Sequence, residues 1–503
     1  MNPHTRNRIT PTNDVISHSE ARDIRNQLSE AETDLTYLNE QIIATRAVLD
    51  KLMGQHRELT AEITEYRISL APHKKLPPEI LGRIFQYCIA DMTLVPPLRH
   101  EDLGNLLHLC HICSYWRRVA LGTPTLWNRI SVQIGFGLYS SDILDVATTL
   151  LSRSGVSTPL SIRLAVFPRH DFVPKDPVQV LINPYINRYQ EITLELSPIS
   201  FLPLLRLPVG SAEVLEVLDL EFFDSDSDYS LDGDFWLNIL AVFNSAPRLR
   251  SVTLRSFDIF DGPELLQLAS SQLTSLHFVD TPLNPDICHA MLRQCPNLIN
   301  CTMCIKSYGG IEESLADLDP IVVLNLRQLK LELWFETSFT PFLRPLVLPA
   351  LKDFGLTGHH NLQYDAFKSL HSRSSFDLER VALTGTVIDG SDVESLLQHM
   401  PFLVELDIRS QRTFDRPTLD MIVKGNLVPK LEIVNFASLL PNVALNIIQS
   451  RWYMGYVGSN SSDVSISRLR EAVVSQRCLN PTHSLVHTRL ERFRQEGLLV
   501  HYH

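Results

Sequence analysis

A spacing of apolar residues recurs through most of the chain and limits the folds that it can adopt. The pattern apolar-x-x-apolar-x-apolar begins at Leu215, Leu249, Leu273, Leu298, Leu326, Leu351, Leu378, Leu403 and Leu431. Successive starts are 24 to 34 residues apart, and weaker copies begin at Pro159, Tyr189 and Leu469. Stretches with helical spacing, such as Pro285 to Arg293, lie between the copies. One strand and one helix in each repeat predict stacked units rather than a single closed core.

This period resembles the irregular leucine-rich repeats. The resemblance implies a curved α/β solenoid with a parallel sheet on its concave side, because each helix is wider than the spacing between strands. We expect the solenoid over residues 131–463, and a capping repeat of strand, helix and strand over residues 464–503. The alternative is a doubly wound α/β domain, but no glycine-rich phosphate loop follows any of the predicted strands.

Residues 76 to 127 hold a different pattern, made of short amphipathic segments. Leu76-Pro77-Pro78 leads into apolar residues with helical spacing, and proline is favoured at the first helical position. A second helix is predicted through Leu106 to Trp116, and Leu126-Trp127 follows it. The order of these residues resembles an F-box, the helical module that docks a receptor on the Skp-type adaptor of a cullin ubiquitin ligase. We expect a small all-α F-box over residues 72–130.

The resemblance to the F-box implies a set of adaptor-binding residues. They are Leu76, Pro77, Ile80, Leu81, Ile84, Phe85, Leu106, Leu109, Ile112 and Trp116. A module of this size cannot bury enough apolar surface alone, so a partner is expected to complete its core. The simpler alternative is a helical hairpin packed on its own chain. The connection from Asp91 to Asp102, which contains Pro96-Pro97, departs from the family pattern because it is longer.

A long run of heptads precedes this segment. The a positions are Leu28, Leu35, Ile42, Leu49, His56, Ile63 and Leu70, and the d positions are Ile24, Ala31, Leu38, Thr45, Leu52, Leu59 and Tyr66. Twelve of these fourteen residues are apolar or aromatic, which predicts a coiled-coil helix over residues 20–71 after a disordered segment, 1–19. Pro72 ends the helix. A coiled-coil homodimer is the favoured role; the alternatives are an arm bound by another protein or a helix folded back on the F-box.

Residues that alternate with the apolar strand positions are expected to face away from the core. They form the predicted substrate-binding face, which comprises Glu191, Glu195, Asp219, Glu221, Arg255, Lys330, Arg380 and Arg409. The first four are acidic and precede the acidic segment Asp224 to Asp234. Like charges on neighbouring strands repel, so we expect a basic segment of a substrate to offset them; the alternative is that they only keep the solenoid soluble. Tyr229 stands where a calcium loop needs glycine.

Composition argues against several classes of function. The formal charge is −12, from 45 basic and 57 acidic residues without a dense basic block, which disfavours nucleic-acid binding. No apolar run approaches the length of a membrane span, and residues 1–14 lack an apolar signal core. We therefore expect a soluble protein of the cytoplasm and/or nucleus with reduced thiols. Cys110 and Cys113 lack a second C-x-x-C at finger spacing, and we expect no metal and no cofactor.

Catalytic residues are not predicted anywhere in the sequence. It holds no G-x-S-x-G elbow, no H-E-x-x-H and no phosphate-binding loop, and His359-His360 lies near no nucleophile motif. The combination resembles fungal-type F-box proteins. It implies a non-catalytic substrate-recognition subunit of a Skp-cullin-F-box ubiquitin ligase, which reaches the cullin/RING core through the Skp-type adaptor and holds a protein substrate on the solenoid. The alternative is a non-degradative scaffold.

Overall fold

The structure is a computed structural model of the whole chain. It describes residues 15–89, 92–94, 104–135, 141–167, 176–222, 238–256, 270–306, 319–334, 338–358, 364–385, 390–409, 416–436, 439–457, 466–480 and 483–502. The predicted loop from Asp91 to Asp102 lies mostly outside these ranges. The acidic segment Asp224 to Asp234 and His359-His360 lie outside them entirely. The chain divides into two units, Met1–Leu81 and Gly82–His503.

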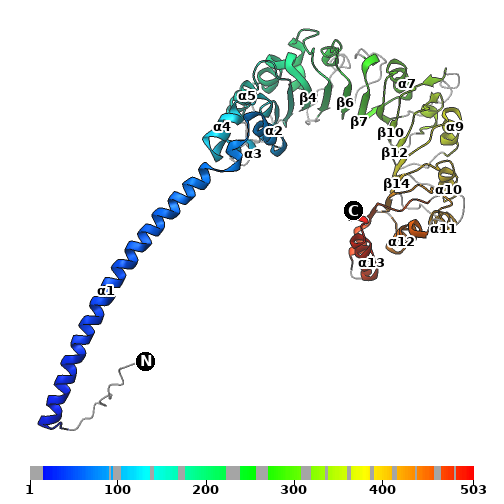
Figure 1. The fold of residues 1–503 in the computed structure, drawn as a ribbon. Coiled ribbons are helices and arrows are strands. Elements are labelled where there is room, and N and C mark those ends of the chain that lie inside the picture. Colours follow the sequence, from blue (N-terminus) through cyan, green and yellow to red (C-terminus); the bar gives the residue numbers. More distant parts are fainter. Residues whose placement is uncertain are drawn as a thin grey trace. The chain divides into compact units, whose positions relative to one another are not determined.

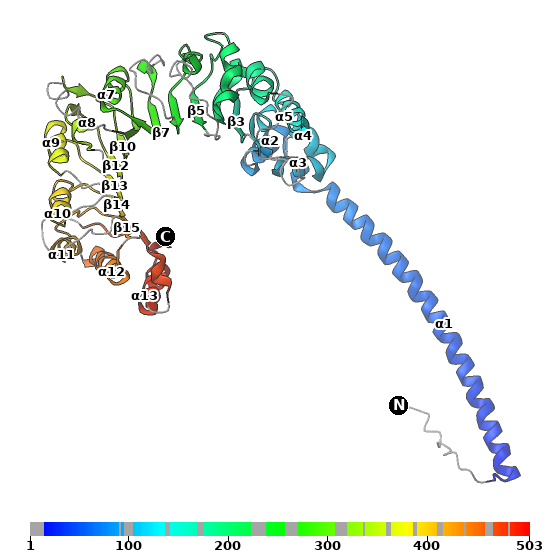
Figure 2. The same cartoon turned by 180° about the vertical axis from the view of Figure 1, so that it is seen from behind.

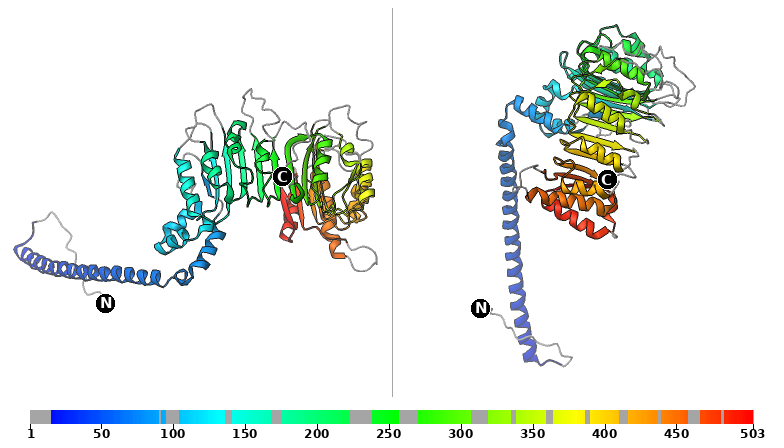
Figure 3. Two further views of the ribbon diagram at one scale, coloured as in Figure 1. Left: turned by 90° about the horizontal axis from the view of Figure 1, so that it is seen from above. Right: turned by 90° about the vertical axis from the view of Figure 1, so that its right-hand side faces the viewer.

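The first unit contains one long helix, α1, which spans His18–Ser69 (Figures 2 and 3). Its start has a capping box, in which the backbone N–H of Ser17 donates to the Glu20 carboxylate over 3.0 Å and the Ser17 hydroxyl accepts from the Glu20 N–H. The helix therefore begins two residues inside the segment 1–19 that was expected to be disordered, of which residues 1–14 lie outside the described residues. None of the residues of α1 is buried.

The second unit is built on a parallel sheet of fifteen described strands, each paired with the next in the order of the chain. The strands are β1 Met92–Leu94, β2 Arg129–Ile134, β3 Leu160–Val166, β4 Tyr189–Leu196, β5 Val217–Phe222, β6 Ser251–Arg255, β7 Ser275–Leu283, β8 Asn300–Ile305, β10 Gln328–Leu333, β12 Asp353–Thr357, β13 Arg380–Thr384, β14 Glu405–Arg409, β15 Ile433–Phe436, β16 Glu471–Val474 and β17 Leu499–Tyr502. Two short strands, β9 (Ile321–Val322) and β11 (Leu346–Val347), pair separately.

Helices connect these strands and, in Figure 1, lie along the outer side of the sheet, as α7, α9 and α10 show most clearly. The α-helices described in this unit are α3 Gly104–Ile112, α4 Ser114–Leu121, α5 Ser141–Arg153, α7 Pro285–Gln294, α8 Thr340–Leu343, α9 Tyr364–Ser374, α10 Gly390–Gln398, α11 Arg416–Lys424, α12 Pro441–Val457 and α13 Ser484–Gln495. Helix α2 (Pro78–Cys88) spans the division between the units. Among the described residues, no helix combines the length and apolarity needed to cross a membrane.

The core of the sheet is a row of apolar side chains that continues from β2 to β17, with one residue from each strand in register. The row comprises Ile130, Ile162, Ile192, Leu218, Val252, Leu276, Cys301, Leu329, Phe354, Val381, Leu406, Val434, Ala472 and Val500. Every member is buried. Nine of them occupy the second apolar position of the repeats found in the sequence, so the repeat marks the strands as predicted.

Two expectations for residues 72–130 need correction. The segment is not all-α, because it contains β1, whose residues Met92 to Leu94 pair with Ile130 to Val132 of β2. The sheet therefore begins upstream of residue 131. The second predicted helix is two helices, α3 and α4, because the backbone of Cys113 is extended (φ −159°, ψ 167°). The Cys113 sulfur then accepts a hydrogen bond from the Trp116 N–H, which caps α4.

Neighbouring residues of β10 provide a test of the register. Leu329 is fully buried, whereas Lys330 is exposed on the opposite face. We expect Leu329→Ala to lower the free energy of unfolding by about 2–4 kcal/mol, because a core leucine loses its packing and leaves a cavity. Lys330→Ala should change it by less than about 0.5 kcal/mol. Urea unfolding of the full chain, followed by circular dichroism, measures both, and equal losses would contradict this register.

Candidate adaptor-binding site and charged sheet face

Helix α2 carries two apolar stripes that differ in exposure. Leu81 and Phe85 are buried, with 1% and 0% of their surface exposed, whereas Ile80 and Ile84 are 46% and 41% exposed. Residues four apart lie on the same face of a helix, so each pair forms one stripe. The inward stripe stabilises the module and the outward stripe is accessible to another protein.

The inward side is held by aromatic residues of the following helices. The ring of Phe85 packs against that of Trp116, with 4.9 Å between ring centroids. Trp127 is fully buried, and its indole N–H donates to the carbonyl oxygen of Ala120 over 2.9 Å. The guanidinium of Arg153, on α5, lies over the Trp127 ring at 4.8 Å. Trp127 therefore ties α4 to the first helix that follows β2.

The ten predicted adaptor-binding residues fall into three groups by exposure. The buried residues are Leu81, Phe85 and Leu106; the half-buried residues are Leu76, Leu109 and Trp116; the exposed residues are Pro77, Ile80, Ile84 and Ile112. Only the exposed and half-buried residues offer surface to a partner. The prediction omitted Tyr87, which is 90% exposed. Its spacing of three residues from Ile84 and seven from Ile80 places it on the same stripe and could have identified it.

Two cysteines of this segment, Cys110 and Cys113, lie at the turn between α3 and α4. Cys110 is buried, and this burial raises the pKa of its thiol. Its carbonyl oxygen accepts a hydrogen bond from the Arg117 side chain over 2.8 Å. Cys113 caps α4 through its sulfur. Both cysteines therefore act in the turn between α3 and α4.

The four predicted carboxylates of the substrate-binding face do lie on neighbouring strands, but they are paired with arginines of the same sheet. Glu191 accepts from Arg129 at 2.6 Å and from the Ser161 hydroxyl at 2.8 Å. Glu195, which is only 7% exposed, pairs with Arg163. Folding therefore places opposite charges beside these two carboxylates.

Asp219 and Glu221 share the third arginine. The guanidinium of Arg255 lies 3.2 Å from Asp219 and 4.0 Å from Glu221. Three strand arginines therefore already offset these carboxylates, so their repulsion does not by itself require a basic substrate segment. Binding of such a segment at this face stays a prediction. Arg129 and Arg163 were missed because the solenoid was expected to begin at residue 131 and its first repeats are weak. Each of them is next in sequence to an apolar strand residue, Ile130 or Ile162, and this alternation could have placed them on the charged face.

The remaining predicted residues of this face differ in their pairing. Arg380 pairs with Asp353 on the neighbouring strand at 2.6 Å, and Arg409 pairs with Asp407 on its own strand at 3.0 Å. Lys330 is exposed on β10, beside Gly355 of β12, and no ion pair joins it to another described residue. The face is therefore largely neutralised within the sheet.

Glu221 provides a pH-dependent test of this electrostatic arrangement. Burial and then the neighbouring Glu195 raise the pKa of Glu221 above its ordinary value of 4.5. A carboxyl group whose pKa is higher in the folded chain lowers stability once it ionises. We expect Glu221→Gln to raise the free energy of unfolding at pH 7, and the gain to disappear below pH 4.5. Urea unfolding at several pH values measures the effect, with E213Q, on an exposed glutamate ahead of β5, as the control. A less stable variant at pH 7 would refute the argument.

Comparison with known families agrees with the geometry of the helical segment. The F-box-like family model matches residues 73–133, which contain α2, α3, α4 and most of β2. No curated protein matches the chain. The expectation of an F-box is thus confirmed, and the chain carries an F-box-like domain, a type of domain that typically binds Skp-type adaptors.

Proposed function

We propose that this chain is the substrate-recognition subunit of a Skp-cullin-F-box ubiquitin ligase. The observation that carries the proposal is the outward stripe of α2, formed by Ile80, Ile84 and Tyr87 within the segment that matches the F-box-like family. Apolar side chains exposed side by side are typical of a protein interface. A Skp-type adaptor would cover them and would link the chain to the cullin/RING core.

The repeating sheet is the proposed substrate receptor. Its strands follow chain order and its apolar row repeats with the spacing of leucine-rich repeats, which supports a solenoid that offers an extended surface to a protein. The role of the chain is positional and not catalytic. A substrate held on the sheet meets the ubiquitin-charged enzyme at high effective concentration, while other subunits supply the reacting groups. We place this activity in the cytoplasm and/or nucleus.

Adaptor capture tests the first half of the proposal. Ile80→Ala together with Ile84→Ala should weaken binding of the purified chain to a Skp-type adaptor by more than about a hundredfold, because each truncated anchor costs roughly 2–4 kcal/mol. The circular dichroism spectrum should not change, since both side chains point outward. Phe85→Ala, by contrast, should destabilise the domain, because this ring is buried against Trp116.

The matched control removes similar apolar atoms elsewhere on the surface. Val322 and Leu324 are 51% and 64% exposed and lie far along the chain from the F-box-like domain. V322A/L324A should bind the adaptor as tightly as the wild-type chain does. Undiminished capture by I80A/I84A would refute the adaptor site. Absence of cullin from the tagged protein purified with its adaptor would favour the scaffold over the ligase subunit.

We also propose that α1 pairs with α1 of a second copy of this chain. None of its a and d residues is buried, and most of them are exposed; Leu28, Leu38 and Leu52, for example, are all about half exposed. A helix of 52 residues is about 80 Å long, and an apolar stripe of this length favours burial in a coiled coil. His56, at an a position, would set the register at some cost in stability.

Sedimentation of the full chain tests this pairing. Leu38→Asp with Leu49→Asp should convert a dimer to a monomer at tens of micromolar, because charges would enter the buried seam. Ile43 and Ile68 are at least as exposed as Leu38 and Leu49 but lie at the b and f positions, so I43D/I68D should leave the mass unchanged. His56→Leu should strengthen the dimer. A wild-type chain that sediments as a monomer would contradict the proposal.

A further inference from the structure

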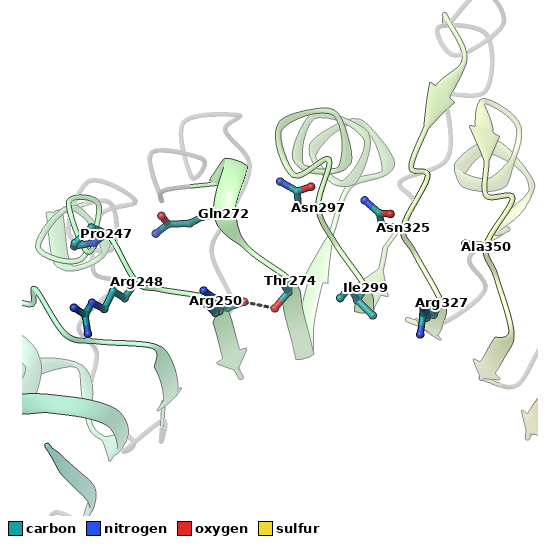
Figure 4. A pocket seen from close by; sticks show the side chains of 10 residues that line it. All are labelled: Pro247, Arg248, Arg250, Gln272, Thr274, Asn297, Ile299, Asn325, Arg327 and Ala350. Carbon is teal, nitrogen blue, oxygen red and sulfur yellow. Dashed lines mark hydrogen bonds between the residues drawn. The ribbon is translucent and has the colours of Figure 1, made fainter.

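A groove runs along one edge of the sheet, at the points where successive strands begin. Its first hollow, of about 460 Å³, is lined by Arg248, Arg250, Gln272, Asn297, Asn325 and Arg327 among others (Figure 4). A second hollow, of about 400 Å³, shares Ala350 with the first and continues past Phe402. The two hollows together are called the edge groove here.

The backbone fixes the spacing of the residues along the edge groove. Arg250, Thr274, Ile299 and Arg327 each precede a strand directly. The N–H of each of the last three donates to the carbonyl oxygen of the one before it, over 2.8 Å in every case. The same ladder continues through Lys352 and Glu379 to Val404, and these three residues line the second hollow. Six steps of about 4.8 Å give roughly 29 Å, the length of about nine residues of an extended peptide.

The first hollow is electropositive. Arg248, Arg250 and Arg327 are exposed, no ion pair joins any of them to a carboxylate among the described residues, and no acidic residue lines the hollow. The arginines of the sheet face differ in this respect: Arg129, Arg163, Arg255 and Arg380 each pair with a carboxylate. In a chain with a formal charge of −12, three guanidinium groups along one groove, none of them in an ion pair with a described carboxylate, favour an anionic ligand.

Amide side chains favour a peptide as that ligand. The side-chain N–H of Gln272 donates to the carbonyl oxygen of Ala246 over 2.7 Å, and that of Asn297 donates to the carbonyl oxygen of Ser271 over 2.8 Å. Their side-chain oxygens are left to accept from peptide N–H groups. Figure 4 shows these amides and Asn325 in a line opposite the row from Arg250 to Arg327. No aromatic residue lines this hollow, which disfavours the base stacking that single-stranded nucleic acid uses.

The second hollow is of mixed character. Phe402 is exposed and Lys430 lies over its ring at 4.2 Å. Lys352 pairs with Glu379, so their charges are compensated. An apolar side chain of a ligand could therefore rest against Phe402 while its acidic part lies in the first hollow.

We propose that the edge groove binds an extended acidic peptide segment of a protein partner. Carboxylate or phosphate groups of the segment lie over Arg248, Arg250 and Arg327, and an apolar residue contacts Phe402. This inference deepens the proposed function, on which it rests for the role of the partner as a substrate. Peptide binding to the groove can be tested without the adaptor, so that failure of the groove proposal does not imply failure of the adaptor proposal, and the reverse also holds.

The test uses the full chain and labelled peptides of about nine residues. One peptide carries a run of glutamates with a leucine at the far end, a second carries phosphoserines in place of the glutamates, and a third carries lysines. Fluorescence anisotropy should detect the first two and not the third, with an affinity that falls as salt rises from about 50 to about 300 mM. Binding of both anionic peptides assigns the site to negative charge in general, and binding of the phosphoserine peptide alone assigns it to phosphate.

Charge reversal locates the site. Arg250→Glu with Arg327→Glu should weaken binding at least about tenfold, because repulsion replaces attraction. Arg206 and Arg344 are also exposed but lie outside the groove, so R206E/R344E should bind normally. If the charge reversal impairs folding, R250Q/R327Q should still weaken peptide binding, though by less than the reversal does. Adaptor capture should be unchanged in all of these variants. The proposal would be overturned if R250E/R327E and R206E/R344E lost peptide affinity equally. It would also be overturned if neither anionic peptide bound, or if oligouridine bound in preference to them.

Discussion

The lateral stacking of one row of buried side chains is the interaction on which the sheet depends. From Ile130 to Val500, each strand adds one residue to this row, in register with its neighbours. Strands lie about 4.8 Å apart, so each side chain is covered mainly by the strands beside it and by the helix behind it. A single repeat has no such cover. Stability is therefore shared along the sheet and is lost at its ends unless they are capped.

The same register determines the electrostatics of the sheet face. Because side chains alternate along a strand, residues on either side of the apolar row must lie beside their counterparts on the next strand. Arginines and carboxylates at these positions meet in pairs, as the register partners Asp353 and Arg380 do. The residues that precede the strands are stacked by the same ladder. There Arg250 and Arg327 lie beside Thr274 and Ile299, and among the described residues no ion pair joins Arg250 to Glu216, its neighbour on the other side. The two surfaces therefore differ in charge although one backbone pattern builds both.

The F-box-like domain shows how a small helical module can keep an accessible apolar surface. Phe85, Trp116 and Trp127 are large enough to fill its interior through contacts within the chain. The outward residues of α2, such as Ile84, are then not needed to fill the core and stay accessible to a partner. Burial and exposure on one helix thus separate the residues that hold the module from those proposed to bind the adaptor.

Much of the fold could be predicted from the sequence, because it depends on local spacing. The repeat located the strands, the prolines located the start of α2, and the order of apolar residues indicated the F-box. Other features depend on contacts between distant residues. The pairing of Met92 with Ile130, the break at Cys113 and the ion pair of Arg129 with Glu191 arise only when strands and helices meet. The edge groove belongs to this second class, since its arginines converge only because hydrogen bonds between strands stack residues that are 24 to 28 positions apart.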